Sequence, residues 1–270
     1  MRVLSWNLFH GRAEPPAGRP LLHEFAATLA GWSWDVALLQ EVPPWWPPLL
    51  ARASGAAGWR SARTSRNAAL PVRRAIAVRR PDLIKSNGGG CNAILVRPPL
   101  TITAHGVRRL RWLPERRVVH AVRVGTASAA DGPVGAGAAG TSTGPGDPAG
   151  AAAADGPVAA GPLWIGNVHG QKGEWDGGRG LEHPLADLRT AVDRLAAWAP
   201  AGPPLLLGGD LNLPREAVAG ALPAGWARIA SSGPDHVLGR GLGAAGDSWR
   251  PERHGLSDHA ALAVDVRIRR

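Results

Sequence analysis

The sequence has few of the residues that would cross-link it or anchor it in a membrane. It contains a single cysteine, Cys91, so an internal disulfide and hence a disulfide-stapled scaffold are excluded. The longest stretch without a charged residue covers 16 positions, 156–171, and contains prolines; a membrane span needs about 18 or more apolar residues. The first residues, MRVLSWN, lack the charged and then apolar layout of a signal peptide. We therefore expect a cytoplasmic protein without a membrane span.

Acidic residues are scarce in one part of the chain. Residues 52–123 carry 16 basic groups against two acids, whereas residues 126–270 carry 12 basic and 15 acidic groups. A one-sided basic field attracts phosphate-bearing partners, although a solvated arginine-rich face would have the same composition. On the first interpretation, a nucleic-acid backbone binds this face without sequence specificity, through Arg60, Arg63, Arg66, Arg73 and Arg74.

Residues 126–162 have the composition of an inserted loop. Of these 37 residues 27 are Ala, Gly or Pro, and the hexapeptide AADGPV occurs twice, at 129–134 and 153–158. Such a segment buries too little apolar area to offset its loss of conformational entropy. We expect residues 1–270 to form a single, monomeric domain in which 126–162 is a disordered surface loop.

Outside this segment, short apolar runs alternate with a few amphipathic stretches. The runs predict strands over 2–8, 35–40, 75–79, 92–97, 100–107, 118–124, 163–168, 205–208, 235–238 and 260–268. Helices are predicted over 21–32, 43–50 and 185–198. Many strands and few helices favour two packed sheets with the helices outside.

Six places at strand ends carry polar side chains that core packing does not require. They are Asn7, the pair Gln40 and Glu41, the pair Asn167 and His169, the pair Asp210 and Asn212, the pair Asp235 and His236, and the triplet Ser257, Asp258 and His259. Singly, each has a structural alternative, because strand-end carboxylates are commonly solvated and Gly and Asp favour tight turns. Together they offer the oxygen ligands that Mg²⁺ prefers, beside imidazoles that bind or protonate phosphate.

The order of these motifs resembles that of the endonuclease/exonuclease/phosphatase superfamily. The matching motifs are WN at 6–7, QE at 40–41, NxH at 167–169, GDLN at 209–212, DHxL at 235–238 and SDH at 257–259. The resemblance covers nearly the whole chain except 126–162. It implies an α/β (α+β) four-layered sandwich, with two central, mainly antiparallel β-sheets packed face to face and helices outside. It also implies hydrolysis of phosphate esters that depends on Mg²⁺, with Mn²⁺ as a substitute.

The resemblance also implies a role for each matching residue. Glu41 would be the principal metal ligand, Asn7 would lie beside the metal, and Asp258 would be a second acid on the metal side. Asp210 and Asn212 would position or activate the attacking water. His259 would stabilise the transition state or relay a proton, and Asp235 would orient His259. His169 would contact the phosphate, and Asn92 lies in a GCNAIL segment that is similar to a strand near the family's site.

Two departures from the family pattern bear on the substrate. The chain has no tyrosine, and Val42 and Pro43 follow the QE pair where abasic-site nucleases carry a lysine. Leu213 and Pro214 follow Asn212, so the inositol-polyphosphate phosphatase signature is absent. We expect a nuclease that acts on DNA or RNA by in-line water attack. The alternatives are a phosphatase of small phosphomonoesters or phospholipid headgroups, and a catalytically dead nucleic-acid-binding module.

Overall fold

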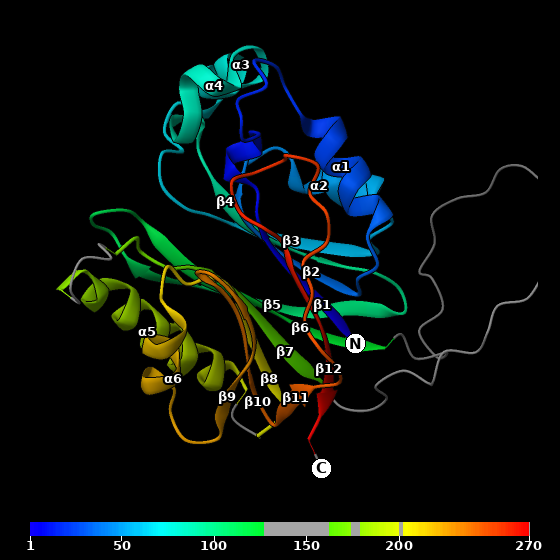
Figure 1. Cartoon of the computed structure of the whole chain (residues 1–270), viewed down its shortest axis with the longest axis vertical. Coiled ribbons are helices and arrows are strands. Elements are labelled where there is room, and N and C mark those ends of the chain that lie inside the picture. Colours follow the sequence, from blue (N-terminus) through cyan, green and yellow to red (C-terminus); the bar gives the residue numbers. More distant parts are fainter. Residues whose placement is uncertain (127–161, 174–178, 200–201, 270) are drawn as a thin grey trace, which may run out of the picture.

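Two six-stranded β-sheets form the centre of the computed structural model, which describes residues 1–126, 162–173, 179–199 and 202–269 (Figure 1). The first sheet has the order β11 (Leu242–Ala244), β12 (Leu262–Ile268), β1 (Arg2–Asn7), β2 (Val36–Val42), β4 (Cys91–Val96) and β3 (Gly58–Arg63). The second sheet has the order β5 (Leu100–Arg111), β6 (Arg117–Thr126), β7 (Leu163–His169), β8 (Leu205–Asp210), β10 (Asp235–Arg240) and β9 (Trp226–Ser232). The pairs β1–β2 and β7–β8 are parallel and the other described pairs are antiparallel.

Three apolar layers hold the molecule together, because alternate residues of each strand point to opposite faces of its sheet. In β1, Val3 faces the second sheet, while Leu4 packs with α1 (Leu22–Gly31) and α2 (Pro47–Ala53). In β8, Leu206 faces the first sheet, and Leu205 packs against α5 (Glu182–Trp198) and α6 (Arg215–Ala221). Figure 1 shows these helix pairs on opposite outer faces. The predicted four-layered sandwich is confirmed.

Between the sheets, the side chains change from apolar to polar along the strands. Leu38 of β2 and Ile165 of β7 belong to the apolar layer between the sheets. Two residues further along each strand, Gln40 donates from Nε2 to Oδ1 of Asn167 at 2.9 Å, and both side chains are fully buried. Burying an amide costs free energy unless it is hydrogen-bonded, and this pair meets that condition. The sandwich therefore has a polar end, and the parallel strands β1, β2, β7 and β8 all finish there.

One predicted strand is wrong. The run at 75–79 lies in helix α3 (Leu70–Arg79), which is followed by α4 (Pro81–Ile84). Pro71 occupies the first turn of α3, a position that proline favours, and a short apolar run does not by itself distinguish strand from helix. No residue of α3 is buried, so residues 75–79 make no contact with a sheet that would favour a strand over the helix.

Three described strands were not predicted: β3, β9 and β11. All three lie at sheet edges. Strands β3 and β9 mix arginines with apolar residues, so their sequences lack the alternation of a half-buried strand. Helices α4 and α6 are one or two turns long and were also missed.

The predicted inserted loop falls between two neighbouring strands. Strand β6 ends at Thr126, β7 begins at Leu163, and the two pair antiparallel. Residues 127–161, which make up nearly all of the predicted loop, lie outside the described residues. Within the described part of the chain, no helix is both long and apolar enough to cross a membrane.

Candidate active site

A cavity of about 610 Å³ opens at the polar end of the sandwich. Seven of the strand-end polar residues singled out in the sequence line it: Asn7, Glu41, His169, Asp210, Asn212, Asp258 and His259. They come from both sheets, from the loop after β8 and from the loop before β12, and they are separated by up to 252 positions in the chain (Asn7 to His259). Glu41 and His259 thus share one cavity, as a joint role in catalysis requires.

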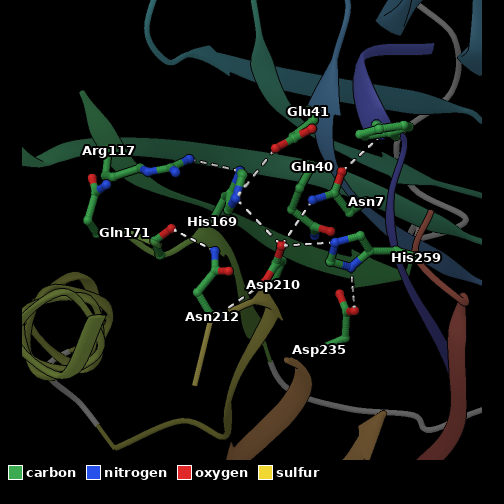
Figure 2. A network of polar contacts seen from close by, with 12 residues as sticks. Asn7, Gln40, Glu41, Arg117, His169, Gln171, Asp210, Asn212, Asp235 and His259 are labelled. Carbon is green, nitrogen blue, oxygen red and sulfur yellow. Dashed lines mark hydrogen bonds and ion pairs between the residues drawn. The ribbon is translucent and has the colours of Figure 1, made fainter. Parts of the chain in front are cut away.

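Asp210 lies at the centre of the cluster (Figure 2). Its Oδ2 accepts a hydrogen bond from Nδ2 of Asn7 at 3.0 Å, and its Oδ1 accepts one from the backbone N–H of Asn212 at 3.0 Å. Two imidazoles flank Oδ2, with Nε2 of His169 at 3.5 Å and Nε2 of His259 at 3.8 Å. Burial, together with the negative charge of Asp235, raises the pKa of Asp210 to about 7.

The two glycines before Asp210 let β8 approach its neighbours closely. A Cβ atom on Gly209 would lie 1.9 Å from the carbonyl oxygen of Val168 in β7, and the φ of Gly209 is +138°. A Cβ on Gly208 would lie 2.6 Å from Cδ1 of Leu38 in the opposite sheet. These contacts explain why two glycines precede Asp210 at the end of β8: the close approach that they permit brings the carboxylate of Asp210 between the two sheets.

His259 is held by Asp235, which begins β10. Oδ2 of Asp235 lies 3.0 Å from Nδ1 of His259, so the ring presents Nε2 to the cavity. Although burial lowers the pKa of His259, the hydrogen bond to Asp235 and the charges of Asp210 and Asp235 raise it to about 9. His259 is therefore an imidazolium at neutral pH, which suits contact with an anionic phosphate.

His169 is held in a different state by Arg117. An arginine can only donate, so Nδ1 of His169, 3.0 Å from Nη1 of Arg117, accepts and the ring proton lies on Nε2. Burial and the nearby positive charge of Arg117 lower the pKa of His169 well below its usual value. Arg117 is in turn paired with Glu115 at 2.7 Å. His169 is thus a neutral ring whose Nε2–H points toward Asp210 and Glu41.

Glu41 reaches the cavity because β2 is irregular at this point. The pairing of β2 with β4 shifts register between Leu39 and Val42, and Glu41 has a φ of +50°. In a regular strand, Gln40 and Glu41 would point to opposite faces; here both point toward the second sheet. The Glu41 carboxylate lies 3.1 Å from Nε2 of His10 and 3.8 Å from Nε2 of His169. Such bulges commonly direct side chains at active sites.

Three predicted residues take more peripheral positions. Oδ1 of Asp258 lies 4.0 Å from Nε2 of His259 at the exposed edge of the cavity. Asp235 stands behind His259, where it orients the ring. Asn92 is fully buried in β4, donates to the backbone oxygen of Val118 at 3.5 Å, and does not line the cavity.

Sequence reasoning missed several residues of the cavity wall. His10, Arg117, Gln171 and Lys172 all line it, but none stands in a motif that was recognised. His10 had one available signal, its position three residues after Asn7 in the loop that follows the first strand. No signal in the sequence marks Arg117, because its role depends on its contact with His169 on the neighbouring strand.

A second cavity, of about 510 Å³, opens on other parts of the sandwich, and its wall includes Leu100, Val124, Leu242 and Ile268. It contains none of the residues predicted to act in catalysis. The chemistry therefore belongs to the polar cavity.

Comparisons with known proteins agree with this fold. No curated protein matches the chain. An endonuclease/exonuclease/phosphatase from Beutenbergia cavernae superimposes with a TM-score of 0.66 at 17% identity, covering 100% of this chain and 72% of its own. D. rerio TDP2 complexed with single strand DNA product superimposes with a TM-score of 0.60 at 14% identity, covering 99% of this chain and 98% of that chain. Bacteroides thetaiotaomicron mannosyl-6-phosphatase Bt3783 superimposes with a TM-score of 0.62 at 13% identity, covering 99% of this chain and 100% of that chain.

At these identities the superpositions show a shared fold. The family itself follows from the sequence, because the model of the Endonuclease/Exonuclease/phosphatase family matches residues 4–259. Its members are hydrolases that act on phosphate esters. The match extends from the first strand to the histidine that Asp235 orients. The chain belongs to the Endonuclease/Exonuclease/phosphatase family.

Proposed function

We propose that this protein hydrolyses phosphodiester bonds by in-line attack of water, with the help of a divalent metal ion. The observation that carries the proposal is the grouping around Asp210. A buried carboxylate lies between a cationic His259 and a neutral His169, and Glu41 lies opposite it on the same cavity. An anionic diester repels an incoming hydroxide, so its hydrolysis needs positive charge and a base in one place.

The residues present fit Mg²⁺, with Mn²⁺ as a substitute. In the described part of the chain, no three His, Cys, Asp or Glu side chains form a ready-made cage for a metal. Mg²⁺ does not need one, since it is commonly held by one or two carboxylates, water and substrate phosphate oxygens. Glu41 would hold the ion, with Asp258 as the second acid. When bound, the metal would neutralise charge on the phosphate.

The chain's own residues supply the remaining functions. Asp210 accepts the proton of the attacking water, whose oxygen bonds to phosphorus while the P–O bond in line with it breaks; the leaving oxygen takes up a proton from solvent water. The N–H groups of Asn7 and Asn212 hold the carboxylate of Asp210 in place. The side chain of Asn212 donates from Nδ2 to the oxygen of Gly170 at 3.1 Å, which fixes the loop after β8. His259 and the Nε2–H of His169 donate to the phosphoryl oxygens, on which negative charge increases during the attack.

Nucleic acid is the substrate that the basic composition favours. Of the five arginines predicted to contact it, Arg66 lines the cavity, and Arg73 and Arg74 lie on α3. The similarity in fold to TDP2, which has been solved with a DNA product, supports this substrate. The fold is also similar to that of a mannosyl-6-phosphatase, so phosphomonoesters are the second candidate.

A hydrolysis panel tests the proposal. The protein is incubated in Mg²⁺, Mn²⁺ or EDTA with each of six substrates: plasmid, single-stranded DNA, RNA, a soluble diester reporter, a phospholipid and sugar phosphates. We expect diester cleavage that EDTA abolishes and that Glu41→Ala and His259→Ala both lose. Glu252→Ala and His23→Ala serve as matched controls, because both side chains are exposed and neither lines the cavity.

Three outcomes would contradict parts of the proposal. Cleavage of monoesters alone would reassign the protein as a phosphatase. Full activity in EDTA would remove the metal from the reaction. Nucleic-acid binding without turnover of any substrate would support the catalytically dead binding module.

A further inference from the structure

Large apolar side chains are exposed in two parts of the chain that also carry its basic residues. In the described residues ten such side chains are exposed, and eight of them lie in the segments 49–83 and 107–113. Scattered exposed apolar residues are normal, whereas a contiguous exposed apolar patch marks an interaction surface. The two segments contain helices α3 and α4 and the end of the β5–β6 hairpin.

The first group lies on α3 and α4. Val72 and Ile76 are one helical turn apart and are 62% and 40% exposed, and Leu83 of α4 is 75% exposed. Because α3 buries none of its residues, core packing does not explain its apolar side chains.

The second group lies at the turn between β5 and β6. Trp112 is 60% exposed and Leu113 is 78% exposed. The guanidinium of Arg109 lies 3.8 Å from the centroid of the Trp112 ring, and that of Arg116 lies 5.6 Å from it. The turn therefore presents a tryptophan and a leucine to solvent among arginines.

The segments that carry the two groups meet at the rim of the catalytic cavity. Arg66 connects them, since it donates to Oγ of Ser86, just after α4, at 2.7 Å and pairs with Oε1 of Glu115, in the hairpin turn, at 2.9 Å. Oγ of Ser65 accepts from the backbone N–H of Arg116 at 2.7 Å. Arg66, Ser86 and Glu115 all line the cavity. In Figure 1, α3 and α4 lie above the projecting end of the β5–β6 hairpin.

The charge of this rim is predominantly positive. Residues 70–86 and 107–117 together carry ten basic groups and two acids. One of the acids, Glu115, is paired with both Arg66 and Arg117, and the other, Asp82, accepts from the backbone N–H of Gly18. Apolar side chains surrounded by arginines match the boundary of an anionic bilayer, where the former enter the headgroup region and the latter pair with lipid phosphates.

We infer that this rim, formed by Val72, Ile76, Leu83, Trp112 and Leu113 with the arginines around them, docks on the surface of an anionic phospholipid bilayer. Docking turns the mouth of the catalytic cavity toward the headgroups, whose phosphodiesters then become candidate substrates; that last step rests on the proposed function. A nucleic acid would pair with the arginines and stack on Trp112, but it leaves Leu83 and Leu113 without a partner.

Vesicle sedimentation tests the inference without any hydrolysis. The full chain is mixed with vesicles of phosphatidylcholine alone or of phosphatidylcholine with phosphatidylglycerol. We expect binding to the anionic vesicles that is roughly tenfold weaker in the double variant Leu83→Ser/Leu113→Ser. The double variant Arg79→Gln/Arg80→Gln is expected to weaken binding roughly 10- to 30-fold. Thermal unfolding of each variant establishes that it is folded.

Matched controls come from outside the rim. Ile268→Ser replaces an exposed apolar residue of β12, and Arg189→Gln/Arg215→Gln removes two exposed arginines from α5 and α6. Both are expected to bind like the wild-type chain.

If the wild-type chain does not bind anionic vesicles, or binds neutral vesicles equally well, the inference is overturned. Loss of single-stranded DNA binding in the leucine variant, when the wild type ignores vesicles, would assign the rim to nucleic acid. A wild-type dimer dispersed by the same variant would assign it to self-association. None of these results depends on turnover, so they test membrane docking independently of the proposed diester hydrolysis.

Discussion

Oδ2 of Asp235 and Nδ1 of His259 form a hydrogen bond of 3.0 Å between a fully buried carboxylate and a partly exposed ring. The bond determines both the direction of the ring and its charge, because Nε2 is left facing Asp210 and the pKa rises to about 9 against the effect of burial. The positive charge that His259 offers to a phosphate depends on this contact.

Asp235→Asn should retain the shape of this contact while removing its charge. We expect the pKa of His259 to fall toward its ordinary value and kcat to fall about 10²- to 10⁴-fold, with a smaller change in KM. NMR titration of the imidazole without divalent metal measures the pKa, and steady-state kinetics measure the rate. Asp193→Asn, on the exposed face of α5, is the control. An unchanged imidazole titration in Asp235→Asn would contradict the role of Asp235.

Glu41→Gln keeps the size of the side chain and removes the charge that would hold the metal. We expect a rate about 10³-fold lower at fixed Mg²⁺, because a bound metal contributes several kcal/mol to the stabilisation of the transition state. Titration of the rate with Mg²⁺, and of the protein with Mn²⁺ by calorimetry, should both show weaker binding. Equal Mn²⁺ affinity in the variant and the wild type would place the metal elsewhere.

Gly209→Ala tests the close approach of β8 to β7. The new Cβ would lie 1.9 Å from the oxygen of Val168, and the φ of +138° is a conformation that L side chains rarely adopt. We expect a loss of more than about 1 kcal/mol in the free energy of unfolding. Gly220→Ala is the control, since its Cβ meets nothing within 4 Å in α6 and helix propensity favours alanine by about 1 kcal/mol. Urea unfolding measures both, and opposite signs are expected.

His120 makes stability depend on pH. It is fully buried between the sheets, and burial together with the charge of His105 lowers its pKa to about 3. The unfolded chain, in which this histidine has its ordinary pKa of 6.5, binds more protons than the folded chain below that pH. Stability contributed by neutral His120 is therefore present above pH 6.5 and is lost as the pH falls toward 3.

At pH 5 the loss from this one group is about 2 kcal/mol relative to pH 8. His120→Leu should reduce the decrease in stability between pH 8 and pH 5 by about that amount, measured by urea unfolding at each pH. An unchanged pH dependence in the variant would show that His120 does not titrate in this way.

Residues 127–161 should be dispensable for catalysis. Their flanking strands β6 and β7 are antiparallel neighbours, with Val124 opposite Leu163, so a short turn joins them without moving either strand. We expect replacement of 127–161 by a Gly-Ser linker to leave kcat within about twofold, because loop length has a small effect on closure. A large loss of rate with intact folding would show that the segment takes part in the reaction.

The sequence alone predicted the architecture, and the strand-end polar residues that it singled out include seven of those that line the cavity. Strand alternation and the order of the motifs predicted two mainly antiparallel sheets with outer helices, and Asp210, His169 and His259 were recognised as strand-end polar residues. The wrong strand at 75–79 and the missed edges β3 and β9 share a cause: short segments with few buried residues carry little periodicity.

Tertiary structure decided the chemical state of each group. The irregular pairing of β2 turns Glu41 toward the second sheet, Arg117 sets the tautomer of His169, and Arg66 brings the rim at α4 beside the β5–β6 turn. A linear pattern records which residues alternate along one strand. It does not record register between strands or which charge lies 3 Å from which ring, and these distances determine the protonation and orientation of buried groups.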